Sequence, residues 1–264
     1  MSPSLMIVAV HRPCRRLPPI PSRGFSLVEL LMTLATIAVL LGLLLPTLSR
    51  ARQAGFEAVC TNNLRQLNAA WQGYVSDHQE TFPLASVRPD WHFAGVTFVG
   101  VEQVPMLDQT RPLNRYLGAG DMPGDPVSRV MMCPGDGGVW RRTSRPGARG
   151  FSMLGQAGGE TCYRFYGNSY SANPRLLDSR LAGLDGSPRP LRQSDILVDT
   201  SRLLIAGDGT WRYAVPALIE GDAGLEASWH AKPDCGHFLA ADGSARRANF
   251  AAEHGRTFTL SPRP

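Results

Sequence analysis

The feature that most constrains this chain is an apolar run near its N-terminus. Residues 25–45 read FSLVELLMTLATIAVLLGLLL, which is 21 residues with Glu29 as the single charge. A helix of that length can cross the hydrocarbon core of a bilayer. An ordinary secretory signal has a shorter apolar stretch that ends in a small-residue cleavage site, and residues 43–46 (LLLP) offer no such site. We therefore expect a single transmembrane helix over residues 25–46.

The positive charge of the chain is concentrated before this run. The net charge is +5, and residues 1–24 contribute four arginines and no acid. The rest of the chain holds 23 basic and 22 acidic side chains, which is close to neutral. A basic leader before a neutral body is typical of a targeting signal and not of a nucleic-acid-binding surface. We expect no nucleic-acid partner, and the leader predicts an N-terminus that stays in the cytoplasm.

Glu29 is the informative residue of the apolar run. A carboxylate within a membrane span costs about 2.5–3.5 kcal/mol on insertion scales, so it usually has a partner. If the chain were cut between Gly24 and Phe25, a new α-amino group would arise four residues before Glu29. That amine could pair with Glu29 of a neighbouring copy and set the register of helix packing. A protonated or snorkelling carboxyl near the headgroups is the open alternative.

Residues 23–29 read RGFSLVE. With the basic leader and the apolar span, they resemble the class III signal of type IV prepilins and type II secretion pseudopilins. The resemblance implies that a membrane prepilin peptidase cuts after Gly24 and methylates the new N-terminal Phe25. It also places Glu29 at the fifth mature position, where the family carries an acid. Pro46 is then the twenty-second mature residue, where many pilins have proline.

The helical pattern continues beyond Pro46. Apolar residues recur mostly at spacings of three or four and predict one apolar stripe, formed by Leu48, Phe56, Cys60, Leu64, Leu67, Trp71 and Tyr74. Pro46 should kink the helix without ending it, because it removes one backbone donor. We expect the helix to end near Asp77. The chain is thus divided into a leader (1–24), a membrane or filament-core helix (25–46), an amphipathic continuation (47–79) and a head (80–264).

The head is rich in glycine and proline and has short apolar runs. Strands are expected at Val96–Val101, Leu203–Ala206 and Phe238–Ala241, because turn signals bound these runs. The predicted fold class is α+β, with one long transmembrane and amphipathic helix packed on a small antiparallel sheet. The resemblance to pilins implies the same layout.

The resemblance extends into the head in patches. Residues 60–67 (CTNNLRQL), 133–136 (CPGD) and 166–173 (YGNSYSAN) are similar to a large group of pilin-like proteins with elaborated heads. That group closes with a histidine, nine residues and Asp-Gly. Asp242-Gly243 fits the closing turn, but eleven residues separate it from His230. His230 therefore departs from the family spacing by two residues.

The cysteines suit an oxidising compartment. Cys14 lies in the leader, and the four in the body, Cys60, Cys133, Cys162 and Cys235, are even in number and irregularly spaced. This pattern predicts one or two disulfides, with three pairings open and four buried thiols as the alternative. No CxxC pair is present, which disfavours a structural zinc site.

A metal or acid–base cluster is a weaker hypothesis for the head. Asp208-Gly209 and Asp242-Gly243 each follow a predicted strand, and they could combine with Asp199, His230 and His237. Asp-Gly after a strand is more often simply a turn, so the turn is the favoured interpretation. We expect no cofactor and no metal. Calcium is left open, because some pseudopilins that resemble this chain bind it near the C-terminus.

The sequence thus favours a structural role over catalysis. The resemblance implies a pseudopilin of a type II secretion system, assembled with other pseudopilins from the inner membrane into a periplasmic filament. A type IV pilus subunit on the cell surface is the alternative, because both use the same signal. A membrane-tethered enzyme or ligand-binding head is more remote, and it predicts a deep polar pocket with convergent histidine and aspartate side chains.

Overall fold

The computed structural model describes residues 26–84, 91–96, 111–118, 129–138, 140–141, 161–177, 189–215, 225–226, 229–230 and 234–264. The leader, Gly24 and Phe25 lie outside the described residues, as does all of the predicted strand Val96–Val101 except Val96, which is not in a strand. The chain divides into two compact units, Met1–Leu48 and Ser49–Pro264.

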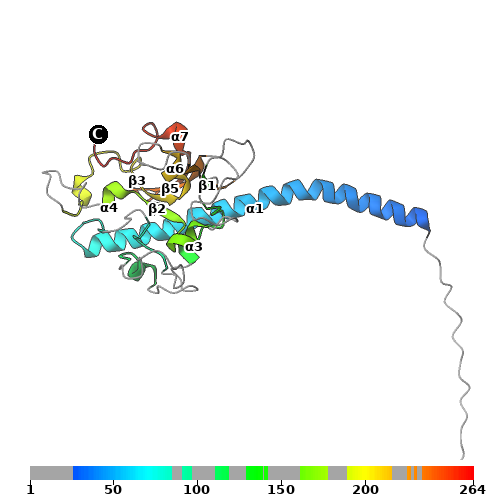
Figure 1. The fold of residues 1–264 in the computed structure, drawn as a ribbon, viewed down its shortest axis with the longest axis horizontal. Coiled ribbons are helices and arrows are strands. Elements are labelled where there is room, and N and C mark those ends of the chain that lie inside the picture. The colour runs from blue at the N-terminus through cyan, green and yellow to red at the C-terminus, as the bar shows by residue number, and fades with distance from the viewer. Residues whose placement is uncertain are drawn as a thin grey trace, which may run out of the picture. The chain divides into compact units, whose positions relative to one another are not determined.

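One long helix dominates the N-terminal part of the described chain (Figure 1). Helix α1 runs from Leu27 to Asp77, 51 residues, with Pro46 inside it. The predictions that Pro46 does not end the helix and that the helix ends near Asp77 are both confirmed. Beyond the end, Gln79 and Glu80 adopt positive φ angles of 54° and 60°, which turns the chain away from the helical path.

The first unit presents apolar side chains on every side of α1. Exposed fractions of the large apolar residues range from 74% at Leu27 to 50% at Leu41. A helix that is apolar all round requires lipid or other helices around it, because water is a poor solvent for such a surface. Among the described residues, α1 is the one helix long and apolar enough to cross a membrane.

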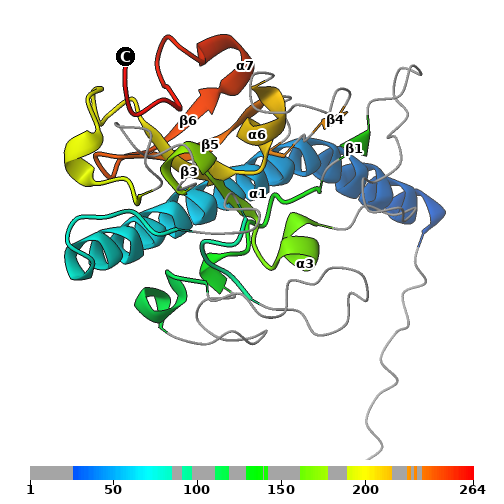
Figure 2. The same cartoon turned by 60° about the vertical axis from the view of Figure 1, so that its left-hand side comes forward.

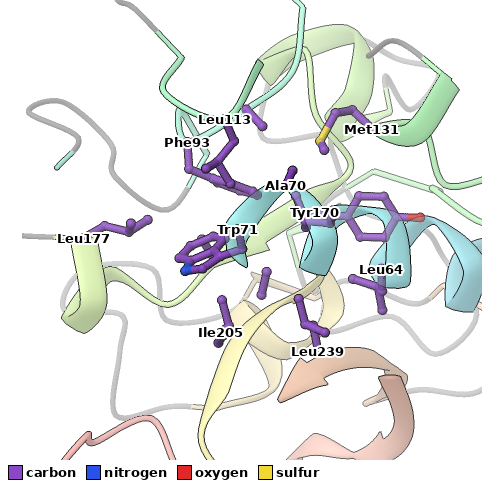
Figure 3. Packing of buried hydrophobic residues seen from close by; sticks show 14 of the residues in the cluster. Leu64, Ala70, Trp71, Phe93, Leu113, Met131, Tyr170, Leu177, Ile205 and Leu239 are labelled. Carbon is purple, nitrogen blue, oxygen red and sulfur yellow. The ribbon is translucent and has the colours of Figure 1, made fainter. Parts of the chain in front are cut away.

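In the second unit, α1 is buried along a single face. The buried positions follow helical spacing and are Cys60, Asn63, Leu64, Leu67, Ala70, Trp71 and Val75. Figure 3 shows Leu64, Ala70 and Trp71 directed at core side chains of other segments, among them Ile205 and Leu239. The predicted stripe is buried from Cys60 to Trp71, and Phe56 and Tyr74 are partly buried. Leu48 is 66% exposed and belongs to the first unit.

The main sheet of the head has four antiparallel strands in the order β2-β3-β5-β6. The strands are β2 (Tyr170–Ala172), β3 (Leu204–Asp208), β5 (Cys235–Ala240) and β6 (Ala245–Asn249). A separate pair joins β1 (Trp140–Arg141) to β4 (Leu225–Glu226). The architecture is therefore a long helix with a small antiparallel sheet, as the sequence predicts at this coarse level.

Two of the three predicted strands correspond to β3 and β5, and the turn predicted at Asp242-Gly243 joins β5 to β6. Gly243 has φ of 86°, a conformation that side chains other than glycine rarely adopt, and its N–H donates to Ala240 O at 2.9 Å. The predicted hairpin turn is confirmed here.

Short helices complete the head. They are η1 (Asn114–Leu117), α3 (Cys162–Tyr166), α4 (Pro174–Leu177), η2 (Gln193–Asp195), α6 (Thr210–Ala214) and α7 (Phe250–Glu253). The sheet lies between the second half of α1 on one side and α6 and α7 on the other (Figures 1 and 2). Successive side chains of a strand point to opposite faces, so Leu239 joins the core on the α1 side and Phe238 joins the core of Trp211, Phe250 and Phe258.

The packing of α1 on the sheet makes a first prediction. Leu64→Ala removes a fully buried side chain and should lower the free energy of unfolding of the head by about 2–5 kcal/mol, because it leaves a cavity. Arg65→Ala, at the exposed next position, is the matched control. Guanidinium unfolding followed by tryptophan fluorescence measures both. Equal stability of the two variants would contradict this packing.

Candidate functional site

The start of α1 holds Glu29, the residue for which the sequence predicts a role in assembly. Glu29 lies in the first turn of α1, and its Oε2 accepts a hydrogen bond from the Ser26 N–H at 3.0 Å. A carboxylate is stabilised there by the free N–H groups and the positive end of the helix dipole. Glu29 therefore has a partner within its own chain, which the sequence interpretation missed. Its second oxygen can accept from another donor.

A disulfide joins α1 to the CPGD segment. Cys60 and Cys133 are bonded across a sequence separation of 73 residues, with Cα atoms 5.5 Å apart. Cys162 is free and buried, and Cys235 is free and partly buried. The structure thus selects one bond among the open pairings. A cross-link over a loop of this length stabilises a fold by about 2–4 kcal/mol, mainly by restricting the unfolded chain.

The aspartate of the CPGD segment is a structural anchor. Asp136 accepts backbone hydrogen bonds from Gly138, Cys162 and Tyr163 at 2.8–3.0 Å, and one from Ser169 Oγ at 2.7 Å. Burial raises its pKa, while these donors favour the charged form. Two of the donors start α3 and one belongs to the YGNSYSAN segment that follows it, so Asp136 links the CPGD segment to a part of the chain 26 to 33 residues later.

The YGNSYSAN segment is held by its two asparagines. Asn168 donates to Ala94 O at 3.2 Å and accepts from Tyr170 N at 2.7 Å. Asn173 donates to Leu204 O and Leu260 O at 2.9 and 2.8 Å. Both side chains are fully buried. Buried amides with satisfied hydrogen bonds fix one arrangement of the chain, so this motif is explained by folding.

Asp208, which pairs with Tyr170 of the YGNSYSAN segment in the sheet, belongs to a buried group with His230 and His237. The Oδ2 atom of Asp208 lies 3.5 Å from Nε2 of His230 and 3.9 Å from Nδ1 of His237. The two imidazole rings meet edge to face with centroids 5.0 Å apart. The side chains of Asp208 and His230 have no exposed surface, and that of His237 has 5%. The same Nε2 atom of His230 also lies 3.4 Å from Sγ of Cys133.

The carboxylate of this group is oriented by the backbone. Asp208 Oδ2 accepts from the His237 N–H at 2.7 Å, and Oδ1 accepts from the Thr210 N–H at 3.2 Å. Burial raises the pKa of Asp208 to about 7 and lowers the pKa of His230 to about 4, because both charged forms lose hydration. Burial also lowers the pKa of His237.

Glycines allow the group to converge. A Cβ added at Gly236 would overlap the Asp208 carboxylate, and one at Gly135 would lie 2.6 Å from Cε1 of His230. His230 itself has φ of 52°, which is uncommon for a residue other than glycine. The local backbone is therefore shaped around these three side chains.

The other acids of the hypothesised cluster lie apart from it. Asp199 and Asp242 are exposed, and each accepts from a backbone N–H two residues later, at Ser201 and Ser244, both at 2.9 Å. These are local turns. At Asp208-Gly209 the favoured turn is also present, since Gly209 forms the turn by which β3 passes into α6, but here the Asp208 side chain is fully buried.

The described head therefore does contain the convergent histidine and aspartate side chains that the tethered-head alternative predicts, but in buried form. His230 takes part in this group although its spacing to Asp242-Gly243 departs from the family pattern. Comparison of the chain with models of known protein families, with curated proteins and with solved structures finds no match.

The close approach at Gly236 makes a second prediction. Gly236→Ala should lower the melting temperature of the head, because the new methyl group must displace the Asp208 carboxylate from its backbone donors. Gly55→Ala is the matched control: it lies in α1 with nothing within 4 Å of an added Cβ, and should raise stability by up to about 1 kcal/mol. Thermal unfolding by circular dichroism separates the two. A stable Gly236→Ala variant would contradict the observed contact.

Proposed function

We propose that this chain is a structural subunit of a pilus-type filament, a pseudopilin of a type II secretion system. The observation that carries the proposal is the position of the RGFSLVE signal. The signal ends in the first turn of a 51-residue helix. The first part of this helix is apolar on all sides, and the second part buries one of its faces in the core of the head. The chain would be cut after Gly24 and held in the inner membrane, with the head in the periplasm.

Assembly then follows from the physical properties of the helix. During assembly the apolar surface of residues 27–48 leaves the lipid and packs against the same surface of neighbouring copies. Close van der Waals packing between the helices supplies the attraction. The Phe25 amine created by cleavage pairs with the Glu29 carboxylate of a neighbour. Because an unpaired charge in an apolar core is strongly unfavourable, this pair selects one register.

Two alternatives share part of this support. A type IV pilus subunit uses the same signal and helix, and differs in its partners and in a location on the cell surface. A tethered enzyme is favoured by the convergence of Asp208, His230 and His237. Their burial counts against it, since Asp208 and His230 present no side-chain surface to a substrate.

Processing is tested at the proposed cleavage site. Gly24→Asp should block the peptidase, because a charged side chain replaces the residue next to the cut bond. The chain should then keep its 24-residue leader and run larger on an immunoblot of the membrane fraction. Ser22→Asp adds the same charge two residues upstream and should be processed normally. Normal processing of Gly24→Asp would count against the proposal.

Assembly is tested at Glu29. Glu29→Gln keeps a hydrogen-bond acceptor for the Ser26 N–H but removes the charge, so the chain should be inserted and cut yet fail to form multimers. Cross-linking in intact cells followed by detergent extraction reports the multimers. Glu57→Gln is the control, because Glu57 pairs with Arg247 of the head at 3.1 Å. A wild-type multimer ladder from Glu29→Gln would remove the proposed role of the charge.

A further inference from the structure

We propose that Asp208, His230 and His237 bind one divalent transition-metal ion, of which Zn²⁺ is the type, inside the head. Each residue offers one ligand atom, and the three atoms lie within 4.8 Å of one another. The site is independent of the filament proposal, because all three residues belong to the second unit, Ser49–Pro264.

The spacing of the ligand atoms fits a small four-coordinate ion. Bonds of about 2.0–2.1 Å in a tetrahedron place neighbouring ligand atoms about 3.3 Å apart. Oδ2 of Asp208 lies 3.5 Å from His230 Nε2 and 3.9 Å from His237 Nδ1. These two distances are close to that ideal separation, and the three ligand atoms all lie within 4.8 Å of one another. Metal binding therefore requires the ligand atoms to move closer together without a change of fold.

The cluster has hydrogen-bonding capacity that the protein does not use. Nδ1 of His237 is buried and has no hydrogen-bond partner, although it faces Asp208. Nδ1 of His230 is likewise buried and unpartnered. Buried polar atoms without partners are rare in folded proteins and require an explanation. A cation between the imidazoles and the carboxylate satisfies the His237 nitrogen.

Burial bears on the charge of the same three side chains. It works against the charged form of each, which raises the pKa of Asp208 and lowers those of both histidines. Metal ligation requires an ionised carboxylate and neutral imidazoles. A divalent cation beside Asp208 would favour the ionised form of the buried carboxylate.

The donor set selects the class of ion. Two imidazole nitrogens and one carboxylate oxygen suit zinc and related transition metals. Calcium needs six to eight oxygens, whereas this group offers one carboxylate whose Oδ1 accepts from Thr210 N–H. Cys133 Sγ is close to His230, but it is bonded to Cys60 and is not a thiolate. A water completes the coordination in this proposal.

The backbone around the group is adapted to hold it. His230 occupies a left-handed conformation, which is unfavourable for a residue other than glycine and tends to occur at functional sites. Two backbone N–H groups orient the Asp208 carboxylate, as an outer shell does for a metal ligand. His237 retains 5% side-chain exposure and so lies where an ion can reach the group.

The test uses the full-length chain in detergent with its disulfide intact. After removal of bound metal with a chelator and dialysis, zinc chloride is titrated by calorimetry. We expect one ion per chain and a rise in melting temperature on addition of zinc. The absence of saturable binding to the folded wild-type chain would overturn the proposal.

Variants assign the ligands. Asp208→Asn and His237→Gln should each weaken zinc binding by at least about 100-fold, since loss of even an outer-shell partner costs 10–100-fold. Asp208→Asn is nearly isosteric and keeps an acceptor for the His237 N–H, so its fold can be checked by near-ultraviolet circular dichroism. His254→Gln replaces an exposed histidine and should bind as the wild type does. Loss of binding in His254→Gln, or wild-type affinity in both cluster variants, would place the ion elsewhere.

X-ray absorption at the zinc edge gives a readout that needs no variant. The proposal predicts nitrogen and oxygen neighbours only, with the signal of imidazole rings. Sulfur in the first shell would show a cysteine ligand, and the assignment to Asp208, His230 and His237 would be wrong.

Discussion

The whole structure depends on one constraint, which is that a single helix has to suit two surroundings. Along residues 27–48 every face of α1 is apolar, so it requires lipid or other helices. From Cys60 to Val75 only one face is buried, and that face forms part of the core of the head. Both patterns belong to one unbroken helix, α1, which runs through Pro46 from Leu27 to Asp77.

The head is specified as much by buried polar contacts as by its apolar core. Asp136, Asn168 and Asn173 satisfy backbone groups of segments far apart in the chain, and the Cys60–Cys133 bond attaches one of those segments to α1. Each of these three polar side chains is costly to bury unless its hydrogen-bond partners are in place, so together the three disfavour alternative packings of the head. Asp208 differs, because it lies beside two histidines whose Nδ1 atoms have no hydrogen-bond partner.

The parts that the sequence predicts are those with a long or local signal. The helix from the apolar run to Asp77 follows from periodicity over many turns, and the hairpin at Asp242-Gly243 follows from turn chemistry. Strand β2 and helices α3 and α7 were not predicted, because three to five residues carry too little pattern. The Cys60–Cys133 pairing and the approach of Asp208 to His230 depend on long-range packing, which spacing along the chain does not encode.

The central claim, that α1 becomes a filament helix by cleavage before Phe25, is tested most directly by the mass of the N-terminal peptide. The measurement compares peptides from cells with and without the prepilin peptidase. The account predicts a peptide that begins at N-methylated Phe25 and disappears when the peptidase is absent. A chain that still begins before Gly24 in cells that have the peptidase, or one cut beyond Pro46, would contradict it.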